Sequence, residues 1–202
     1  RIEDVLKGKL TVSRLRNIDV VDLLGREEVQ LDRTKIAEQL ENEVVLVSGA
    51  GGSIGSEICR QIAKFGPKKL ILLGHGENSI YLIDKELRNL HVRTIEIIPV
   101  IADIQDRERI FQVMETYKPD HVFHAAAHKH VPLMEYNPME EIKNNVYGSK
   151  NMAEAAKAAG VKSFVMISTD KAVRPTNVMG STKRIAEILV TSLNEPGKTK
   201  FA

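Results

Sequence analysis

The stretch VSGAGGSIGSE, residues 47–57, leads from a buried apolar run into a helical pattern through closely spaced glycines. Gly49, Gly52 and Gly55 follow the spacing G-x-x-G-x-x-G rather than G-x-G-x-x-G. Such a turn lets the backbone approach the phosphates of a dinucleotide, and the helix that follows directs its free N–H groups and positive dipole end at them. Taken alone, the stretch is equally well explained as a glycine-rich turn without a ligand.

The chain around this turn alternates apolar runs with amphipathic stretches. Five runs have the continuous apolar character of strands that are buried on both faces: Val44–Val47, Leu70–Leu73, Ile95–Ile101, His121–Ala125 and Phe164–Ile167. Five stretches have helical periodicity: Ser53–Phe65, Ser79–Leu90, Asp106–Tyr117, Pro138–Ala159 and Val178–Leu193. This alternation predicts an α/β fold, a doubly wound (Rossmann) parallel sheet with helices on both faces. In the order 3-2-1-4-5 the third strand lies at or near an edge, where Pro99 is tolerated.

The composition is that of a globular protein, with 43% hydrophobic and 28% charged residues. The 29 Lys+Arg and 27 Asp+Glu leave a net charge of +2, which argues against a nucleic-acid or membrane-surface protein. The single cysteine, Cys59, indicates a reducing compartment, so we expect this stretch of chain to be cytoplasmic.

The chain starts at Arg1, and we expect it to be part of a longer protein. Two regions differ in pattern. Residues 1–40 mix charged and apolar residues without a sustained period and predict an N-terminal helical arm, with a short helix over Arg33–Leu40. Residues 41–202 form the predicted NAD(P)-binding Rossmann domain.

The end of the second predicted strand bears on the choice of coenzyme. An NAD site usually has an acid there that accepts from the ribose 2′-OH, but this strand ends at Gly74. Glu77, or a contact from Asn78 or Ser79, is a substitute, whereas His75 is placed to face the 2′-phosphate of NADP. We favour NAD as the coenzyme, with NADP as the alternative.

The other candidate coenzyme residues lie at the carboxyl ends of the predicted strands or on the helices that follow, where doubly wound folds bind their ligands. Small side chains after the fourth strand let the sheet approach the nicotinamide, and an aspartate after the third is placed for the adenine amino group or caps a helix. This set comprises Gly49, Gly51, Gly52, Ser53, Ile54, Gly55, Asp103, Ile104, Ala125, Ala126, Ala127, Lys129, Asn144 and Lys183.

Three histidines close together at the end of the fourth strand suggest a metal site at first sight. His124, His128 and His130 have no cysteine near them, and Glu135 offers one carboxylate at an unhelpful spacing. We therefore expect no metal, and we place His128 at the mouth of the coenzyme crevice.

The residues after the fifth strand are candidates for the chemistry. Asp170 and Lys171 put an acid and a base side by side, as an elimination requires. On the next helix, Lys183 can reach the nicotinamide ribose and the reacting hydroxyl. The alternative is that Ser168–Asp170 caps a loop and that Lys183 is a solvated helix lysine.

Four motifs together resemble the CapD-type polysaccharide-biosynthesis proteins, which are extended short-chain dehydrogenases/reductases that act as nucleotide-sugar 4,6-dehydratases. The motifs are DLLGR (22–26), GAGGSIGSE (49–57), HAAAHKHVPLME (124–135) and STDKAVRPTNVMGSTKR (168–184). The resemblance implies that the coenzyme takes a hydride from sugar C4, that water is lost across C5–C6, and that the hydride returns to C6. It implies UDP-N-acetylglucosamine as the substrate and a 4-keto-6-deoxy sugar nucleotide as the product.

The same resemblance implies roles for individual residues. Thr169 would hold the C4 oxygen, Asp170 would protonate the departing C6 hydroxyl, and Lys171 would take the C5 proton. Met179 stands where the superfamily usually has a tyrosine, and a thioether cannot act as a base. The C4 proton acceptor therefore stays open between a water, Thr169 relaying to Asp170, and Lys183.

Relatives of this type also have N-terminal transmembrane helices and a C-terminal region that closes over the nucleotide sugar. We therefore expect a parent protein anchored in the inner membrane, a homo-oligomer, and little activity from this stretch alone. The alternatives to a dehydratase are a nucleotide-sugar epimerase, which does not need the pair Asp170–Lys171, and a non-catalytic NAD-binding module.

Overall fold

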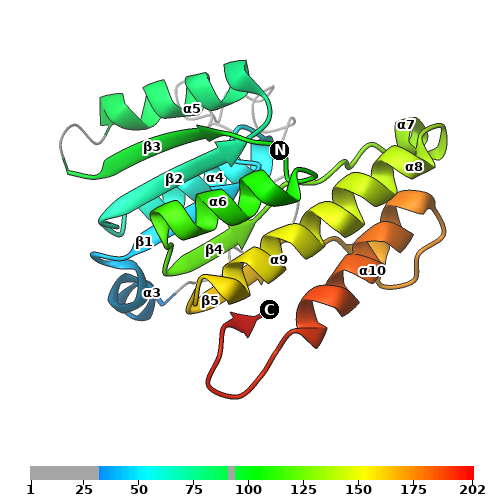
Figure 1. Cartoon of the computed structure of the whole chain (residues 1–202). Helices are drawn as coiled ribbons and strands as arrows, with labels where there is room; N and C mark the ends of the chain where they lie inside the picture. The colour runs from blue at the N-terminus through cyan, green and yellow to red at the C-terminus, as the bar shows by residue number, and fades with distance from the viewer. Residues whose placement is uncertain (1–31, 91–93) are drawn as a thin grey trace, which may run out of the picture. The chain divides into compact units, whose positions relative to one another are not determined.

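The computed structural model describes residues 32–90 and 94–202, and Figure 1 shows their arrangement. Among these residues, six parallel strands form one sheet in the order β3-β2-β1-β4-β5-β6. The strands are β1 (Val44–Ser48), β2 (Lys69–Gly74), β3 (Glu96–Ile101), β4 (His121–His124), β5 (Ser163–Met166) and β6 (Lys200–Phe201). The predicted doubly wound sheet is confirmed, and Pro99 lies in β3, at the end of this order.

The helices follow the expected alternation, with two differences. The described ones are α3 (Arg33–Leu40), α4 (Ser53–Ala63), α5 (Glu77–Leu90), α6 (Arg107–Tyr117), α7 (Val131–Glu135), α8 (Pro138–Glu141), α9 (Ser149–Ala158) and α10 (Val178–Ser192). The short α7 was not predicted. The single helix predicted over Pro138–Ala159 is wrong in detail, because a π-helical segment, η2 (Ile142–Gly148), joins α8 to α9. A π segment adds residues to a turn without changing the apolar pattern on either side, so periodicity does not reveal it.

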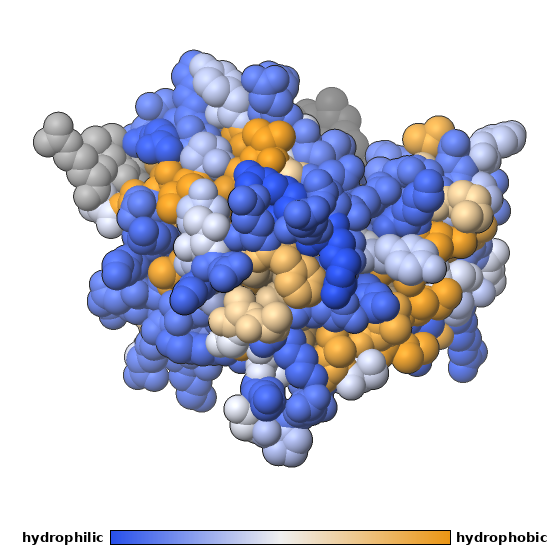
Figure 2. Space-filling view, viewed as in Figure 1, coloured by the Kyte–Doolittle hydropathy of each residue, from blue (hydrophilic) through white to orange (hydrophobic). Residues whose placement is uncertain are grey.

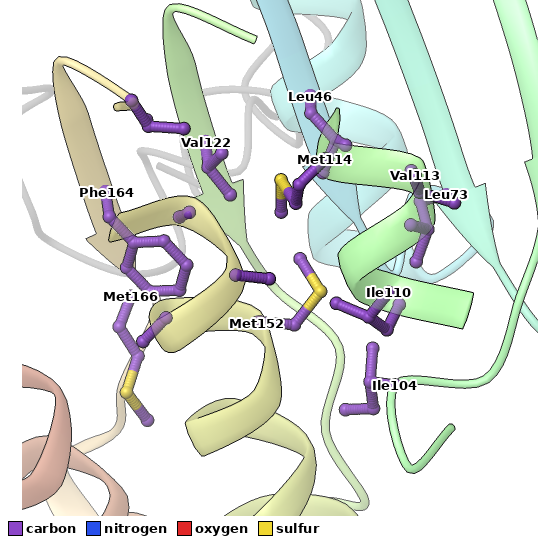
Figure 3. Close-up of a cluster of buried hydrophobic side chains, with 14 of the residues drawn as sticks. Leu46, Leu73, Ile104, Ile110, Val113, Met114, Val122, Met152, Phe164 and Met166 are labelled. Atoms are coloured by element: carbon purple, nitrogen blue, oxygen red, sulfur yellow. The ribbon is translucent and has the colours of Figure 1, made fainter. Parts of the chain in front are cut away.

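Successive side chains of β1 point to opposite faces of the sheet and enter two different cores. Leu46 packs toward α6, α9 and α10, in a cluster that includes Val122, Phe164 and Met152 (Figure 3). Val45 and Val47 pack on the other face, toward α4 and α5. Both faces of the sheet are therefore covered by helices, which leaves the carboxyl ends of the strands as the edge where a ligand can bind.

Some of the sequence-based predictions concern residues that the structure does not describe. Apart from α3, the predicted arm over residues 1–40 lies outside the described residues, as does the DLLGR motif. None of the helices within residues 32–90 and 94–202 is long and apolar enough to cross a membrane.

Ile185 and Ile188 on α10 are exposed, and Figure 2 shows apolar surface there. An oligomer would bury such a surface, but the homo-oligomer remains a prediction.

Candidate functional site

A pocket of about 250 Å³ opens at the carboxyl ends of the central strands. It is lined by nine of the residues predicted to bind the coenzyme: Gly49, Gly51, Gly52, His75, Ile104, Ala125, Ala126, Ala127 and Asn144. The rest of the lining is Leu73, Gly74, Gly76, Ser79, Ala102 and His128. The pocket thus lies on both sides of β1, at the point where the strand order reverses, as expected for a dinucleotide crevice.

The amino end of α4 borders this pocket without a capping side chain. Its N-cap residue is Gly52, whereas Asp106 and Asn177 cap α6 and α10 through their side chains. A Cβ at Gly55 would lie 2.0 Å from the Gly49 carbonyl oxygen, so Gly55 is required by the protein's own packing. A Cβ at Gly52 would meet only that oxygen, at 3.3 Å. The space over Gly52 and the helix N–H groups is therefore open to an anionic ligand.

A lysine from the loop after β4 reaches the same helix end. Lys129 Nζ donates a hydrogen bond of 3.1 Å to Ser53 Oγ, in the first turn of α4. The ammonium group adds its charge to the positive end of the helix dipole. Neither side chain lines the pocket itself, and both lie at its border with solvent.

Only some of the residues proposed to determine the choice of coenzyme line the pocket. His75 and Ser79 line the pocket, and Ser79 Oγ donates to the Gly76 carbonyl oxygen at 2.8 Å. Glu77 begins α5, is exposed, and is not part of the lining. Asp103 is also exposed outside the lining, where its Oδ1 accepts from the backbone N–H of Gln105 at 2.9 Å. No carboxylate belongs to the pocket wall in the described part of the chain.

His124 is a buried structural residue. Its Nδ1 lies 2.6 Å from Ser48 Oγ and its Nε2 lies 2.8 Å from Ser149 Oγ, so it bridges β1, β4 and α9. Burial, and then the positive charge of Lys183, lower the pKa of His124 to about 3, so the ring is neutral. Within the described residues no group of three His, Cys, Asp or Glu is arranged to hold a metal ion.

Asn145, on the π segment η2, is a hub that the sequence analysis missed. Its side chain accepts from the backbone N–H of His128 at 2.9 Å and donates to the carbonyl oxygen of His128 at 3.0 Å. It also donates to Glu141 Oε1 at 2.6 Å. Glu141, Asn145 and Ser149 stand four residues apart on the helical face that continues to the buried Met152, and this spacing was the available signal.

The proposed acid–base pair lies in a short 3₁₀ turn, η3 (Asp170–Ala172), after β5. Thr169 Oγ1 donates to Asp170 Oδ1 at 3.0 Å, and Lys171 Nζ lies 3.7 Å from the same oxygen. The hydrogen bond from Thr169, and then the charge of Lys171, lower the pKa of Asp170, whose side chain is 91% exposed. Asp170 and Lys171 are therefore adjacent and exposed, and the ionised form of Asp170 is stabilised.

Lys183 is buried, so the interpretation as a solvated lysine is wrong. The residue is 6% exposed, and its Nζ donates to the Ile167 carbonyl oxygen at 2.7 Å, at the end of β5. Burial lowers its pKa to about 8. A Cβ at Gly180 would lie 2.3 Å from the Lys171 carbonyl oxygen, so the first turn of α10 packs directly on η3. The structure thus brings Lys183, Met179 and the acid–base pair to one end of the sheet.

Comparisons with known proteins place this architecture in a family. A profile described as "Polysaccharide biosynthesis protein" matches residues 45–202. The chain belongs to this family. It is 62% identical over 201 residues to the capsular polysaccharide biosynthesis protein CapD of Staphylococcus aureus, covering 99% of this chain and 34% of CapD. The predicted resemblance to CapD-type proteins is confirmed.

Two further similarities concern enzymes with stated activities. The chain is 37% identical over 155 residues to a UDP-N-acetylglucosamine 4,6-dehydratase (inverting) of Campylobacter jejuni, covering 74% of this chain and 43% of that protein. It resembles the crystal structure of the UDP-glucose-4-epimerase of Stenotrophomonas maltophila with bound NAD. That match has a TM-score of 0.66 and 27% identity, and covers 75% of this chain and 48% of the epimerase. The chain therefore spans between about a third and a half of the length of these relatives.

Proposed function

We propose that this chain carries the NAD site and the catalytic groups of a nucleotide-sugar 4,6-dehydratase that acts on UDP-N-acetylglucosamine for capsular or other surface polysaccharide. The observation that carries the proposal is the packing of the first turn of α10 on η3, which puts the helix that carries buried Lys183 against the turn that carries Asp170 and Lys171. The similarity to the C. jejuni dehydratase supports the reaction type, and the similarity to CapD supports the biosynthetic role.

The pocket fits a dinucleotide on three observations. The amino end of α4 is uncapped, Gly52 leaves the space over it open, and Lys129 adds a positive charge at its border. Ala125–Ala127 would face the nicotinamide half of the coenzyme. Asn144, Ser79 and His75 would face the rest of it. When bound, NAD supplies the oxidation of the sugar at C4 and the later reduction. The NAD bound in the S. maltophila structure supports the choice of coenzyme.

The chain's own residues then divide the proton transfers. Lys183, with a pKa of about 8, is the C4 proton acceptor in this proposal, because the thioether of Met179 cannot act as a base. Thr169 holds the C4 oxygen. With substrate over the pair, the Lys171 ammonium passes its proton to Asp170, and the neutral amine then takes the proton from C5 and returns one to C5 in the final reduction. Asp170 gives a proton to the C6 hydroxyl as its C–O bond breaks, so that one water leaves. Substrate covering the exposed Asp170 would raise its pKa by desolvation, which a general acid requires.

An epimerase is the second candidate, because the chain also resembles an epimerase structure. Oxidation and reduction at C4 alone give no role to Asp170 and Lys171. The test is mass spectrometry of the reaction of the full-length parent protein with UDP-N-acetylglucosamine and NAD. A product lighter by one water supports the dehydratase. An isomer of unchanged mass supports the epimerase, and absence of any product supports a non-catalytic coenzyme-binding module.

A further inference from the structure

Glu141 is a buried acid that the proposed reaction does not use. The residue is 0% exposed and lies at the junction of α8 and η2. Its Oε1 accepts from Asn145 Nδ2 at 2.6 Å and lies 3.4 Å from Thr182 Oγ1, while its Oε2, also buried, has no hydrogen-bonding partner among the described residues. Burying a carboxyl group with half of its bonding capacity unused is costly, so packing alone does not account for it.

The contacts of Glu141 lead to the first turn of α10. Thr182 Oγ1 donates to the Met179 carbonyl oxygen at 2.9 Å, and Asn145 Nδ2 lies 3.3 Å from the same hydroxyl oxygen. Glu141, Asn145 and Thr182 are all buried. The carboxyl group is thus linked to the start of α10, where Met179 lies in the first turn and Lys183 in the second.

We propose that Glu141 is a positioning residue for the proton chemistry of Lys183: through Asn145 and Thr182 it fixes the first turn of α10, and its buried charge sets how firmly Lys183 holds its proton. The inference rests on the proposed function in taking Lys183 as the C4 proton acceptor. Because Met179 cannot share this proton, the proton affinity of Lys183 is set by the groups buried around it.

The charged and titratable groups around the pair are few. Glu141 interacts with Lys183 on α10, with Glu135 on α7 and with His128 on the loop after β4. Burial raises the pKa of Glu141, and the hydrogen bond from Thr182, then the charge of His128 and then that of Lys183, oppose this.

Around Lys183 itself, burial lowers the pKa, while the carboxylates of Glu187 and Glu141 raise it. His124 on β4 also interacts with Lys183 and is neutral. Glu187 is already engaged by Arg184 and Ser168 at a half-exposed position, where solvent screens its charge. Glu141 acts on Lys183 less strongly than Glu187 does, but Glu141 is fully buried and has no cationic partner within ion-pair distance among the described residues.

The test compares Glu141→Gln with Glu140→Gln. Both remove one negative charge, but Glu140 is half exposed and bonded to Gln105 and His128. The glutamine at position 141 keeps an oxygen that can accept from Asn145. The midpoint of Lys183 is followed by ¹³Cε NMR of lysine-labelled protein without coenzyme, with its signal assigned by its loss in Lys183→Met. We expect the midpoint to fall by about 0.5–1 pH unit in Glu141→Gln and to stay within about 0.2 unit in Glu140→Gln.

A second measurement leaves Glu141 intact, in case Glu141→Gln does not fold. The coupling of two protonation equilibria is reciprocal, so Lys183→Met must raise the midpoint of the Glu141 carboxyl group by the same amount. This midpoint is followed by ¹³Cδ NMR of glutamate-labelled protein. Equal Lys183 midpoints in Glu141→Gln and Glu140→Gln, or an unmoved Glu141 midpoint in Lys183→Met, would overturn the inference. Failure of the full-length parent protein to dehydrate the sugar nucleotide, with these shifts intact, would reject the proposed function and leave the coupling established.

Discussion

Replacing Lys183 by methionine tests the burial of its charge through the pH dependence of stability. The pKa of Lys183 is lowered from 10.5 to about 8 by burial. Between these two values the unfolded chain holds a proton that the folded chain has lost, so this group makes the free energy of unfolding rise with pH. The full rise is about 3 kcal/mol, at about 1.4 kcal/mol per pH unit. Below pH 8 both states are protonated, and the cost of burying the charge is fully present.

The assay is urea unfolding of the protein and of Lys183→Met at pH 7, 8, 9 and 10. The difference between the two free energies of unfolding cancels the titration of the other groups. It also separates the pH-dependent effect from the constant cost of losing the hydrogen bond to the Ile167 carbonyl oxygen. We expect the stability of the unsubstituted protein relative to the variant to improve by about 2–3 kcal/mol between pH 7 and pH 10. Parallel curves would refute the buried, charged lysine.

Lys162 provides a control of opposite sign. Hydrogen bonds and charge from Glu43 and Asp120 raise the pKa of this exposed lysine. A raised pKa stabilises the folded state below the unfolded pKa, and this stabilisation is lost as the pH rises through the folded value. Lys162→Met should therefore lower the free energy of unfolding at neutral pH, and should lower it by less at alkaline pH. A rising difference curve like that of Lys183→Met would show that the assay does not report on burial.

Three further predictions concern the pocket and its supports. His124→Gln should abolish a loss of stability on acidification, because the pKa of His124 is lowered from 6.5 to about 3; urea unfolding should show the parent losing about 2 kcal/mol more than the variant between pH 6.5 and pH 5. Gly52→Val should weaken NAD binding at least tenfold in calorimetric titration with an unchanged melting temperature, because the side chain meets the ligand's space and little of the protein; unchanged affinity would contradict the placement of the phosphates. NADH should bind more tightly than NADPH, and a preference of tenfold (about 1.4 kcal/mol) for NADPH would make His75 a 2′-phosphate contact.

The sheet could be predicted because its signals are local. Each buried strand is a continuous apolar run, and the edge position of Pro99 follows from the absence of its N–H. The glycine turn could be predicted for the same reason, since Gly55 is required by its close approach to Gly49, only six residues earlier.

The electrostatic state of the candidate site could not be predicted from the sequence, because it depends on which side chains are buried by residues distant in the chain. Nothing in the order of residues around Lys183 shows that its ammonium group is buried against the Ile167 carbonyl oxygen. Nor does the order show that Asp170, three residues after Ile167, is exposed. The network of Glu141 and Asn145 was missed for a related reason. The spacing of Glu141, Asn145 and Ser149 places them on one helical face, but polar residues at this spacing are also typical of an exposed face, and the sequence does not show that this face is buried.

The most direct test is the incorporation of solvent deuterium at sugar C5 by the full-length parent protein and by its Asp170→Asn and Lys171→Met variants. The substrate is UDP-N-acetylglucosamine, in D₂O with NAD. The account predicts exchange at C5 in the unsubstituted protein and in Asp170→Asn, loss of exchange in Lys171→Met, and loss of water impaired about 10²–10⁴-fold in both variants. Loss of water at the parental rate in both variants, or an isomeric product without deuterium at C5, would contradict it.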